Sequence, residues 1–235
     1  MEDANPLQAK ETEVALNRNS NRFFSGITSQ KKIKHLEHQL RNIVKPLLEK
    51  ARPGDYHHTL RSVAYGKLLL IYEDGDPEIV LPALYLHDIG WSKVDFRDFI
   101  AAPTFAMKRQ SPSLDAHMKY GAVMARDILR KIGFKAPSID LISLIISIHD
   151  YPEKVFDMKD PSATLVVEAD RLDRFGPAGR KRIKTVFGLE NHQQDKILAL
   201  TKGMEGLVDK WFRTKTAKSL AIKMGTKNGL LSAPI

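Results

Sequence analysis

Residues Ala83 to Trp91 read ALYLHDIGW, and they join an apolar helical segment to a polar end. The apolar run is typical of a helix in a protein core. It stops at His87 and Asp88, which stand side by side, and Gly90 follows. Histidine and aspartate are common metal ligands. The segment therefore raises the question of whether other ligand-type residues recur along the chain.

Helical patterns also precede this segment. Between residues 33 and 51, apolar residues recur three or four positions apart, as on one face of a helix, and Pro53 and Gly54 end the pattern. Asp55 is predicted to cap a second helix that runs to about Tyr72. Pro77 suits the first turn of the next helix, which we expect to end near Gly90.

More helices are predicted after Gly90, and strand-like alternation is nearly absent. Residues 91–112 are expected to form a long, partly irregular loop, and Ser162 is expected to cap one of the later helices. The patterns predict an all-α fold. The later helices are predicted at about residues 113–132, 137–150, 162–175, 178–187, 192–213 and 216–224.

The composition limits the possible kinds of site. The chain has 235 residues, of which 43% are apolar and 28% charged, as expected for one globular domain with an appended segment. It contains no cysteine. Disulfides, thiolate zinc sites and cysteine nucleophiles are therefore excluded, and any metal ion must be held by His, Asp or Glu.

We expect three parts in the chain: a polar tail (residues 1–30), a helical core (31–190) and basic helices packed on that core (191–235). The first 22 residues lack the apolar segment of a signal peptide, and the longest apolar run, residues 141–148, is too short to cross a membrane. We therefore expect a cytoplasmic protein without a membrane partner. The net charge of +9 suits anionic ligands, but no RNP-type motif or zinc-finger spacing favours nucleic acid. The sequence leaves open whether the protein forms a homodimer.

Four of the eight histidines are spaced in a suggestive way. His58, His87, His117 and His149 follow one another at intervals of 29, 30 and 32 residues, and Asp170 lies 21 residues further on. Each is predicted to come from a different helix. Antiparallel helices can point such residues inward at one site.

The residues around these histidines form recognisable motifs. Residues 55–61 read D-x-x-H-x-x-R, residues 87–90 read HDIG, residues 117–122 read H-x-x-x-G-A, and residues 168–173 read EADRLD. Together they resemble the HD-domain superfamily of metal-dependent phosphohydrolases, whose signature is H…HD…D on a helical bundle. The resemblance covers about residues 58–175, half of the chain.

The resemblance implies a site for one or two divalent metal ions. It implies that His58, His87, Asp88 and Asp170 bind one ion and that His117 and His149 hold a second on the far side of Asp88, whose two carboxylate oxygens can bridge both. The register of the first motif favours His58 over His57. Such a set of ligands suits Mn²⁺, Fe²⁺, Co²⁺, Ni²⁺, Zn²⁺ or Mg²⁺. Gly90 would allow the backbone to turn away after the two ligands.

Residues for substrate binding are less clear from the sequence. Lys93, just after HDIG, is a candidate for catalysis and phosphate binding, and Arg109 and Lys108 are candidates for contact with an anion. Asp95 and Asp98 are candidates for protonating a leaving group. Further along, Asp150 either orients His149 or is a surface residue. Arg61 and Arg171 are expected to pair with carboxylates behind the metal ligands.

The leading hypothesis is a hydrolase that cleaves a small phosphorylated substrate, a phosphate ester or nucleotide, with water activated by the metal ions. The alternative is a di-iron oxygenase of the same fold that resembles inositol oxygenase, because the set of ligands permits it. A metal-retaining binding module without turnover is a third possibility. Cyclic-di-GMP is disfavoured as a substrate, because its phosphodiesterases carry a Gly-Tyr-Pro motif that is absent from this sequence, in which Asp150-Tyr151-Pro152 is the nearest tripeptide.

Overall fold

The chain folds into an all-α bundle. The computed structural model describes residues 27–102, 105–186 and 205–227, and these contain helices and no strand. The predicted fold class is therefore confirmed. The elements are α2 (Ile27–Leu48), α3 (Asp55–Tyr72), α4 (Pro77–Leu86), η1 (Ile89–Lys93), α5 (Arg97–Ala101), α6 (Phe105–Arg109), α7 (Pro112–Lys131), α8 (Ala136–Ile148), α9 (Pro152–Asp157), α10 (Pro161–Leu172), η2 (Asp173–Phe175), α11 (Pro177–Val186), η3 (Glu205–Leu207), α13 (Val208–Trp211) and α14 (Lys215–Lys227).

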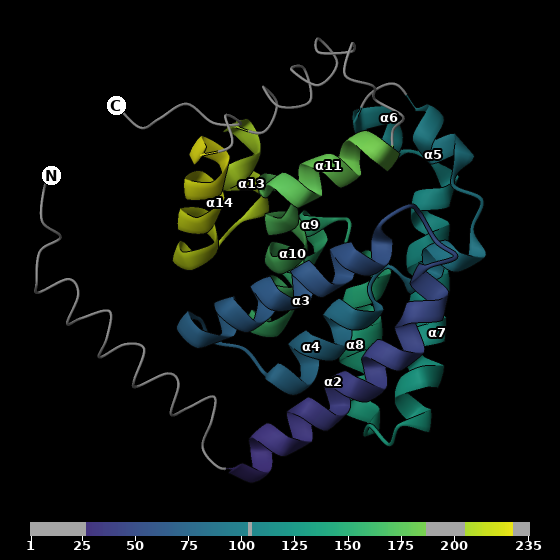
Figure 1. Cartoon of the computed structure of the whole chain (residues 1–235), viewed down its shortest axis with the longest axis vertical. Helices are drawn as coiled ribbons and strands as arrows, with labels where there is room; N and C mark the ends of the chain where they lie inside the picture. The colour runs from purple at the N-terminus through teal and green to yellow at the C-terminus, as the bar shows by residue number, and fades with distance from the viewer. Residues whose placement is uncertain (1–26, 103–104, 187–204, 228–235) are drawn as a thin grey trace, which may run out of the picture.

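Helix α4 lies at the centre of the bundle. Every residue from Ile79 to Leu86 is buried, because α2, α3, α8 and α10 pack around the helix (Figure 1). A helix that is apolar on all sides is stable only in such an environment. The carboxylate of Asp76 caps its N-terminus by accepting a hydrogen bond from the N–H of Glu78, and Pro77 occupies the first turn.

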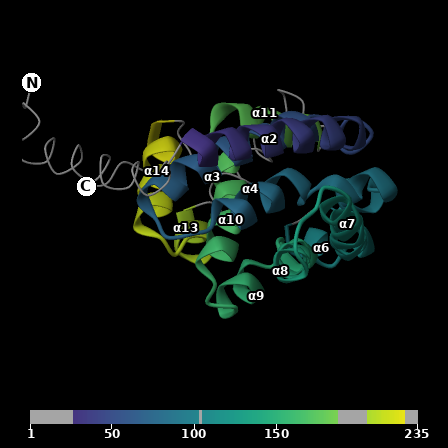
Figure 2. The same ribbon diagram turned by 90° about the horizontal axis from the view of Figure 1, so that it is seen from below.

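The remaining helices cover the two ends of this core. Helices α5, α6 and α7 lie at one end, and α13 and α14 lie at the opposite end (Figures 1 and 2). Helix α14 packs against α3 and α10, and Phe212 and Ala217 are fully buried in the same apolar cluster as α4. The division of the chain at residues 30 and 190 stays a prediction. Within the described residues, no helix has the length and apolar character that a membrane span requires.

Several predicted boundaries differ from the structure. The first helix begins at Ile27, within the expected tail, and α4 ends at Leu86 rather than near Gly90. Residues 91–112 include η1, α5 and α6 instead of one irregular loop. Of the helix predicted at residues 192–213, positions 192–204 lie outside the described residues, and the rest forms only η3 and α13 before an extended residue at Phe212.

Both predicted side-chain caps are wrong. Asp55 is the first residue of α3, the capping position is Gly54 with a φ of 82°, and the buried Asp55 carboxylate contacts Arg52 and Arg182 instead. The left-handed conformation at position 54 favours glycine. At α10 the cap is Asp160, which accepts from the N–H of Ala163, while the Ser162 hydroxyl accepts from the N–H of Asp76. In each case a tertiary contact occupies the side chain.

Candidate metal centre

The six predicted ligands converge in the centre of the bundle. His58 comes from the first turns of α3, His117 from α7 and Asp170 from α10, while the other three follow directly after the ends of α4 and α8. All six are buried, with relative exposures of 3% (His58), 1% (His87), 3% (Asp88), 0% (His117), 2% (His149) and 4% (Asp170). Buried imidazoles and carboxylates require partners, and here they are each other's neighbours.

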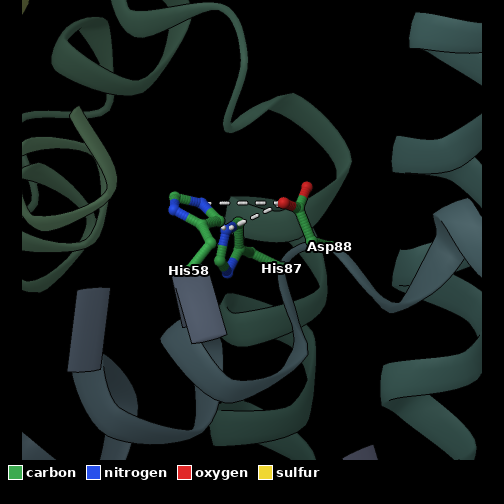
Figure 3. Close-up of side chains that lie close together, drawn as sticks. All are labelled: His58, His87 and Asp88. Carbon is green, nitrogen blue, oxygen red and sulfur yellow. Dashed lines mark hydrogen bonds and ion pairs between the residues drawn. The ribbon is translucent and has the colours of Figure 1, made fainter. Parts of the chain in front are cut away.

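One group of donor atoms gathers around the Oδ2 atom of Asp88. The Nε2 atoms of His58 and His87 are 3.7 and 3.4 Å from this oxygen, and they are 3.3 Å from each other (Figure 3). The Oδ1 atom of Asp170 lies 3.0 Å from His58 Nε2 and 3.7 Å from His87 Nε2. Donor atoms about 2.0–2.2 Å from a shared ion would be roughly 2.8–3.6 Å apart, close to the observed separations.

A second group gathers around the other oxygen of the same carboxylate. The Nε2 atoms of His117 and His149 lie 3.8 and 3.7 Å from Asp88 Oδ1. Two sets of three residues each offer donor atoms that all lie within 4.8 Å of one another, as metal ligands do. These sets are His58, His87 and Asp88, and Asp88, His117 and His149. Asp88 therefore faces one histidine pair with each of its oxygens.

Hydrogen bonds orient three of the rings so that Nε2 faces the other side chains of this cluster, which is called the pocket below. The Nδ1 atoms of His87 and His149 lie 2.7 and 2.8 Å from the carbonyl oxygens of Leu84 and Ile146, one turn earlier in the chain. A carbonyl only accepts, so each Nδ1 carries the proton and Nε2 keeps its lone pair. His58 Nδ1 instead lies 2.7 Å from a carboxylate oxygen of Asp173.

The expected carboxylate behind the ligands is Asp173, and Arg61 holds it. The Arg61 guanidinium donates at 2.6 and 3.0 Å to the two oxygens of Asp173. Burial alone would raise the pKa of Asp173, but hydrogen bonds from His58 and Arg61 lower it to about 2. The carboxylate therefore stays charged and fixes the His58 ring. Arg171 also pairs with carboxylates, at 3.2 Å from Asp150 and 3.3 Å from Asp170, and the second of these is itself a predicted ligand.

His117 provides the clearest test of whether a cation fits. Its ring is fully buried and stacks on Trp91, with ring centroids 4.0 Å apart. Neither of its nitrogens has a hydrogen-bond partner among the described residues. Burial lowers the pKa of His117 to about 3, so the ring is neutral at physiological pH. A buried neutral imidazole without a hydrogen bond is unfavourable unless Nε2 binds an ion, so these residues fit a metal.

Gly90 acts through close packing and not through a turn. Gly90 does not have a positive φ. Among the described residues, positive φ values occur at Gly54, Gly133 and Lys159. A Cβ atom on Gly90 would lie 1.9 Å from the carbonyl oxygen of His117 and 2.6 Å from the N–H of Gly121. Glycine is therefore needed because the backbone of α7 touches η1 there, which brings His117 beside Asp88.

Hydrogen bonds and ion pairs set the charge states of the ionisable groups in the pocket. Burial and the nearby Arg182 would lower the pKa of His58, yet hydrogen bonds to Asp170 and Asp173 raise it. The pKa of Asp170 lies well below its usual value in spite of burial, mainly because of His58 and the two arginines beside it. The pocket thus stabilises the anionic form of its carboxylates and positive charge next to them.

Sequence reasoning missed three arginines of the pocket: Arg52, Arg174 and Arg182. Arg52 is buried, donates to Asp88 Oδ2 at 2.7 Å and lies 4.1 Å above the Trp91 ring. Burial opposes its charge, but Asp55 and Asp88 raise its pKa. The only local signal was its spacing of three residues from Asp55. Arg174 lies four residues after Asp170, one helical turn away, which was a local signal for that pair. Arg182 is far in sequence from Asp55 and Asp88, and no local pattern links it to them.

The predicted substrate residues lie apart from the six ligands. Lys93 is exposed on η1, and Arg109 pairs with Glu153 beside the Tyr151 ring. Among the described residues, neither makes a hydrogen bond or ion pair with the six, and both stay predictions as phosphate contacts. His57, the rival of His58, is exposed.

Three further candidates have local partners instead of a place in the pocket. Lys108 is buried and donates to the carbonyls of Phe99 and Ile100, and burial lowers its pKa to about 8. Asp95 pairs with Arg97 at the surface, and Asp98 accepts from Ser111 and Ser113 at the start of α7. These positions give no support to Asp95 or Asp98 as the group that protonates a leaving group.

The fold and the pocket define an all-α protein with a buried histidine–aspartate site suited to divalent metal ions. The family model of the HD domain matches residues 55–174, and the chain belongs to this family. HD domains bind divalent metals and are generally metal-dependent hydrolases. No curated protein and no solved structure matches the sequence.

Proposed function

We propose that the protein is a metal-dependent phosphohydrolase that cleaves a phosphate ester, either a nucleotide or a small phosphorylated metabolite. His58, His87, Asp88 and Asp170 would hold one divalent ion, and His117 and His149 would hold a second against the same aspartate. When bound, such ions lower the pKa of water and offset the charge that develops on phosphoryl oxygens. The paired donor groups on both oxygens of Asp88 are the observation that supports this proposal.

The arginines of the pocket support an anionic substrate. Each carboxylate of the pocket already has an arginine within 4 Å, as in the pairs Arg52–Asp88, Arg61–Asp173, Arg171–Asp150, Arg174–Asp170 and Arg182–Asp55. Since the carboxylates are compensated by these side chains, added divalent ions would leave the pocket positively charged. Phosphate is a suitable ligand for such a site, and an uncharged polyol is less so.

Arg174 is the arginine best placed to reach a phosphate. Its Nη2 atom is 3.7 Å from both Asp150 and Asp170, which is beyond hydrogen-bond distance, and a quarter of its side chain is exposed. Burial and the neighbouring Arg171 lower its pKa to about 10, so it remains charged at neutral pH. Its guanidinium can therefore donate to an anion without first breaking a short ion pair.

A substrate screen under two atmospheres tests the proposal. The purified chain is loaded with Mn²⁺ or Co²⁺ without oxygen and given a panel of phosphomonoesters and nucleotides, and released phosphate is measured. We expect turnover that is lost in Asp88→Asn and kept in Asp95→Asn, whose carboxylate is exposed. Oxygen consumption by Fe²⁺-loaded protein, without phosphate release from any compound, would instead establish the oxygenase alternative.

A further inference from the structure

The two donor groups around Asp88 differ in the number of predicted ligands that they contain. On the Oδ2 side, two imidazoles are joined by a second carboxylate, that of Asp170. On the Oδ1 side, the predicted ligands are only His117 and His149. A divalent ion with two imidazoles and one shared carboxylate would have fewer protein ligands than its neighbour.

Asp150 lies at the corresponding place on the Oδ1 side. Its Oδ2 atom is 3.5 Å from His117 Nε2 and 3.8 Å from His149 Nε2. These distances resemble the 3.0 and 3.7 Å that separate Asp170 from its own histidine pair. The carboxylate is largely buried, with 14% of its side chain exposed.

One arginine holds both carboxylates in the same manner. Arg171 Nη1 lies 3.2 Å from Asp150 Oδ1 and 3.3 Å from Asp170 Oδ2. Arg174 Nη2 is 3.7 Å from the same two oxygens. Each aspartate thus directs one oxygen to the arginines and the other to a histidine pair.

We propose that Asp150 is a metal ligand, which completes a second position of two imidazoles and two carboxylates next to the first. The inference rests on the metal site of the proposed function. The other role open to Asp150 is to neutralise Arg171 and Arg174 without touching an ion. The two roles differ in what happens to the number of bound ions when the charge at position 150 is removed.

The test compares metal binding by Asp150→Asn and wild-type protein. Both are treated with chelator, dialysed, titrated with Mn²⁺ by calorimetry and then assayed for metal by elemental analysis. We expect two ions per wild-type chain and one per Asp150→Asn chain, with the affinity of the remaining ion within about threefold of the tighter wild-type site. Asp170→Asn should remove the other ion, and Asp140→Asn, at an exposed aspartate paired with Arg126, should keep two.

A second variant keeps the test decisive if Asp150→Asn folds poorly. Asp150→His restores a donor atom without the negative charge, so it should recover a second ion when Co²⁺ is used, visible as added d–d absorption. Two ions bound to Asp150→Asn with wild-type affinity, or one ion in the wild type, would overturn the inference. Absence of any bound ion in the wild type would overturn the proposed function too, whereas two ions without phosphate release would contradict that function alone.

Discussion

Asp88 organises the pocket because each of its oxygens faces a different pair of histidines. Burial would raise its pKa, but the charge of Arg52 and the nearby rings of His87 and His149 keep the pKa well below its usual value. The carboxylate therefore stays charged although only 3% of the residue is exposed. A charged group at this depth is stable only when it is paired on every side, which makes it a suitable bridge between two cations.

The ring of His117 should stay neutral over the whole physiological pH range. Its folded-state pKa of about 3 lies below the value of about 6.5 for an unfolded chain. Between these two pH values the unfolded state binds more protons than the folded state, so the free energy of unfolding rises with pH. The protein therefore loses stability as the pH falls below about 6.5. This one group contributes at most about 1.4 kcal/mol per pH unit.

Ring NMR of chelator-treated protein measures this property. The His117 signals, assigned by their loss in His117→Gln, should keep the chemical shifts of the neutral form from pH 8 to pH 5. His117→Gln should also show a shallower loss of thermal stability than the wild type over that range. A His117 ring that titrates between pH 5 and pH 8 would contradict the burial and stacking described above.

Among the elements, the contact between η1 and α7 sets the geometry of the second donor group. Gly90 and Gly121 lie where the two backbones meet, and the Cβ of an alanine at position 90 would overlap the carbonyl of His117. The obstacle is backbone rather than a flexible side chain, so α7 must move away.

Gly90→Ala should therefore destabilise the fold by about 1–3 kcal/mol, the usual cost of overpacking a core. For a chain of this length, that corresponds to a fall in Tm of several degrees, measured by differential scanning calorimetry. Gly206→Ala is the control, because among the described residues no atom beyond its chain neighbours lies within 4 Å of a Cβ at that position. Equal Tm values for the two variants would show that η1 and α7 tolerate separation.

Local sequence patterns were sufficient for some elements and residues and not for others. The apolar run before His87 and Pro77 at a helix start depend on neighbours along the chain, and the structure agrees with both. The choice of His58 over His57 as a ligand stays a prediction, which the burial of His58 and the exposure of His57 favour. The role of Gly90 could not be predicted, because it depends on the backbone of α7.

Long-range pairing explains the other differences. Asp55 and Ser162 have the residue types of helix caps, but Arg182 and the N–H of Asp76 engage them across the fold. Arg52 also joins the pocket by such a contact, 36 residues from Asp88. Arginine and aspartate are frequent at protein surfaces, so their sequence positions alone carry little information about a buried pairing.

Across the whole molecule, a buried carboxylate connects the core that carries the candidate metal centre to the C-terminal helices. Glu168 of α10 is fully buried, and it accepts hydrogen bonds from the N–H groups of Arg213 and Thr214 and from the Thr214 hydroxyl. Burial raises its pKa in spite of these bonds. The contact lies just before α14 and two residues from Asp170, so it links the docking of this end to the helix that bears a candidate ligand.

Glu168→Ala should loosen α13 and α14 while leaving the far end of the bundle intact. Hydrogen bonds to a charged group contribute about 1.5–3 kcal/mol, so amide exchange in residues 208–227 should accelerate tenfold or more. Hydrogen–deuterium exchange with mass spectrometry measures this, with α7 as the internal reference. Glu153→Ala, at an exposed glutamate, should leave exchange unchanged. Unaltered protection of α14 in Glu168→Ala would refute the link.

Anomalous diffraction from crystals grown with Mn²⁺ would locate the ions themselves. The account predicts two peaks, one on each side of the Asp88 carboxylate, the first within about 2.5 Å of donor atoms of His58 and His87 and the second equally close to His117 and His149. Occupied manganese elsewhere, with no peak within coordination distance of Asp88, would contradict the assignment of this pocket as a metal centre.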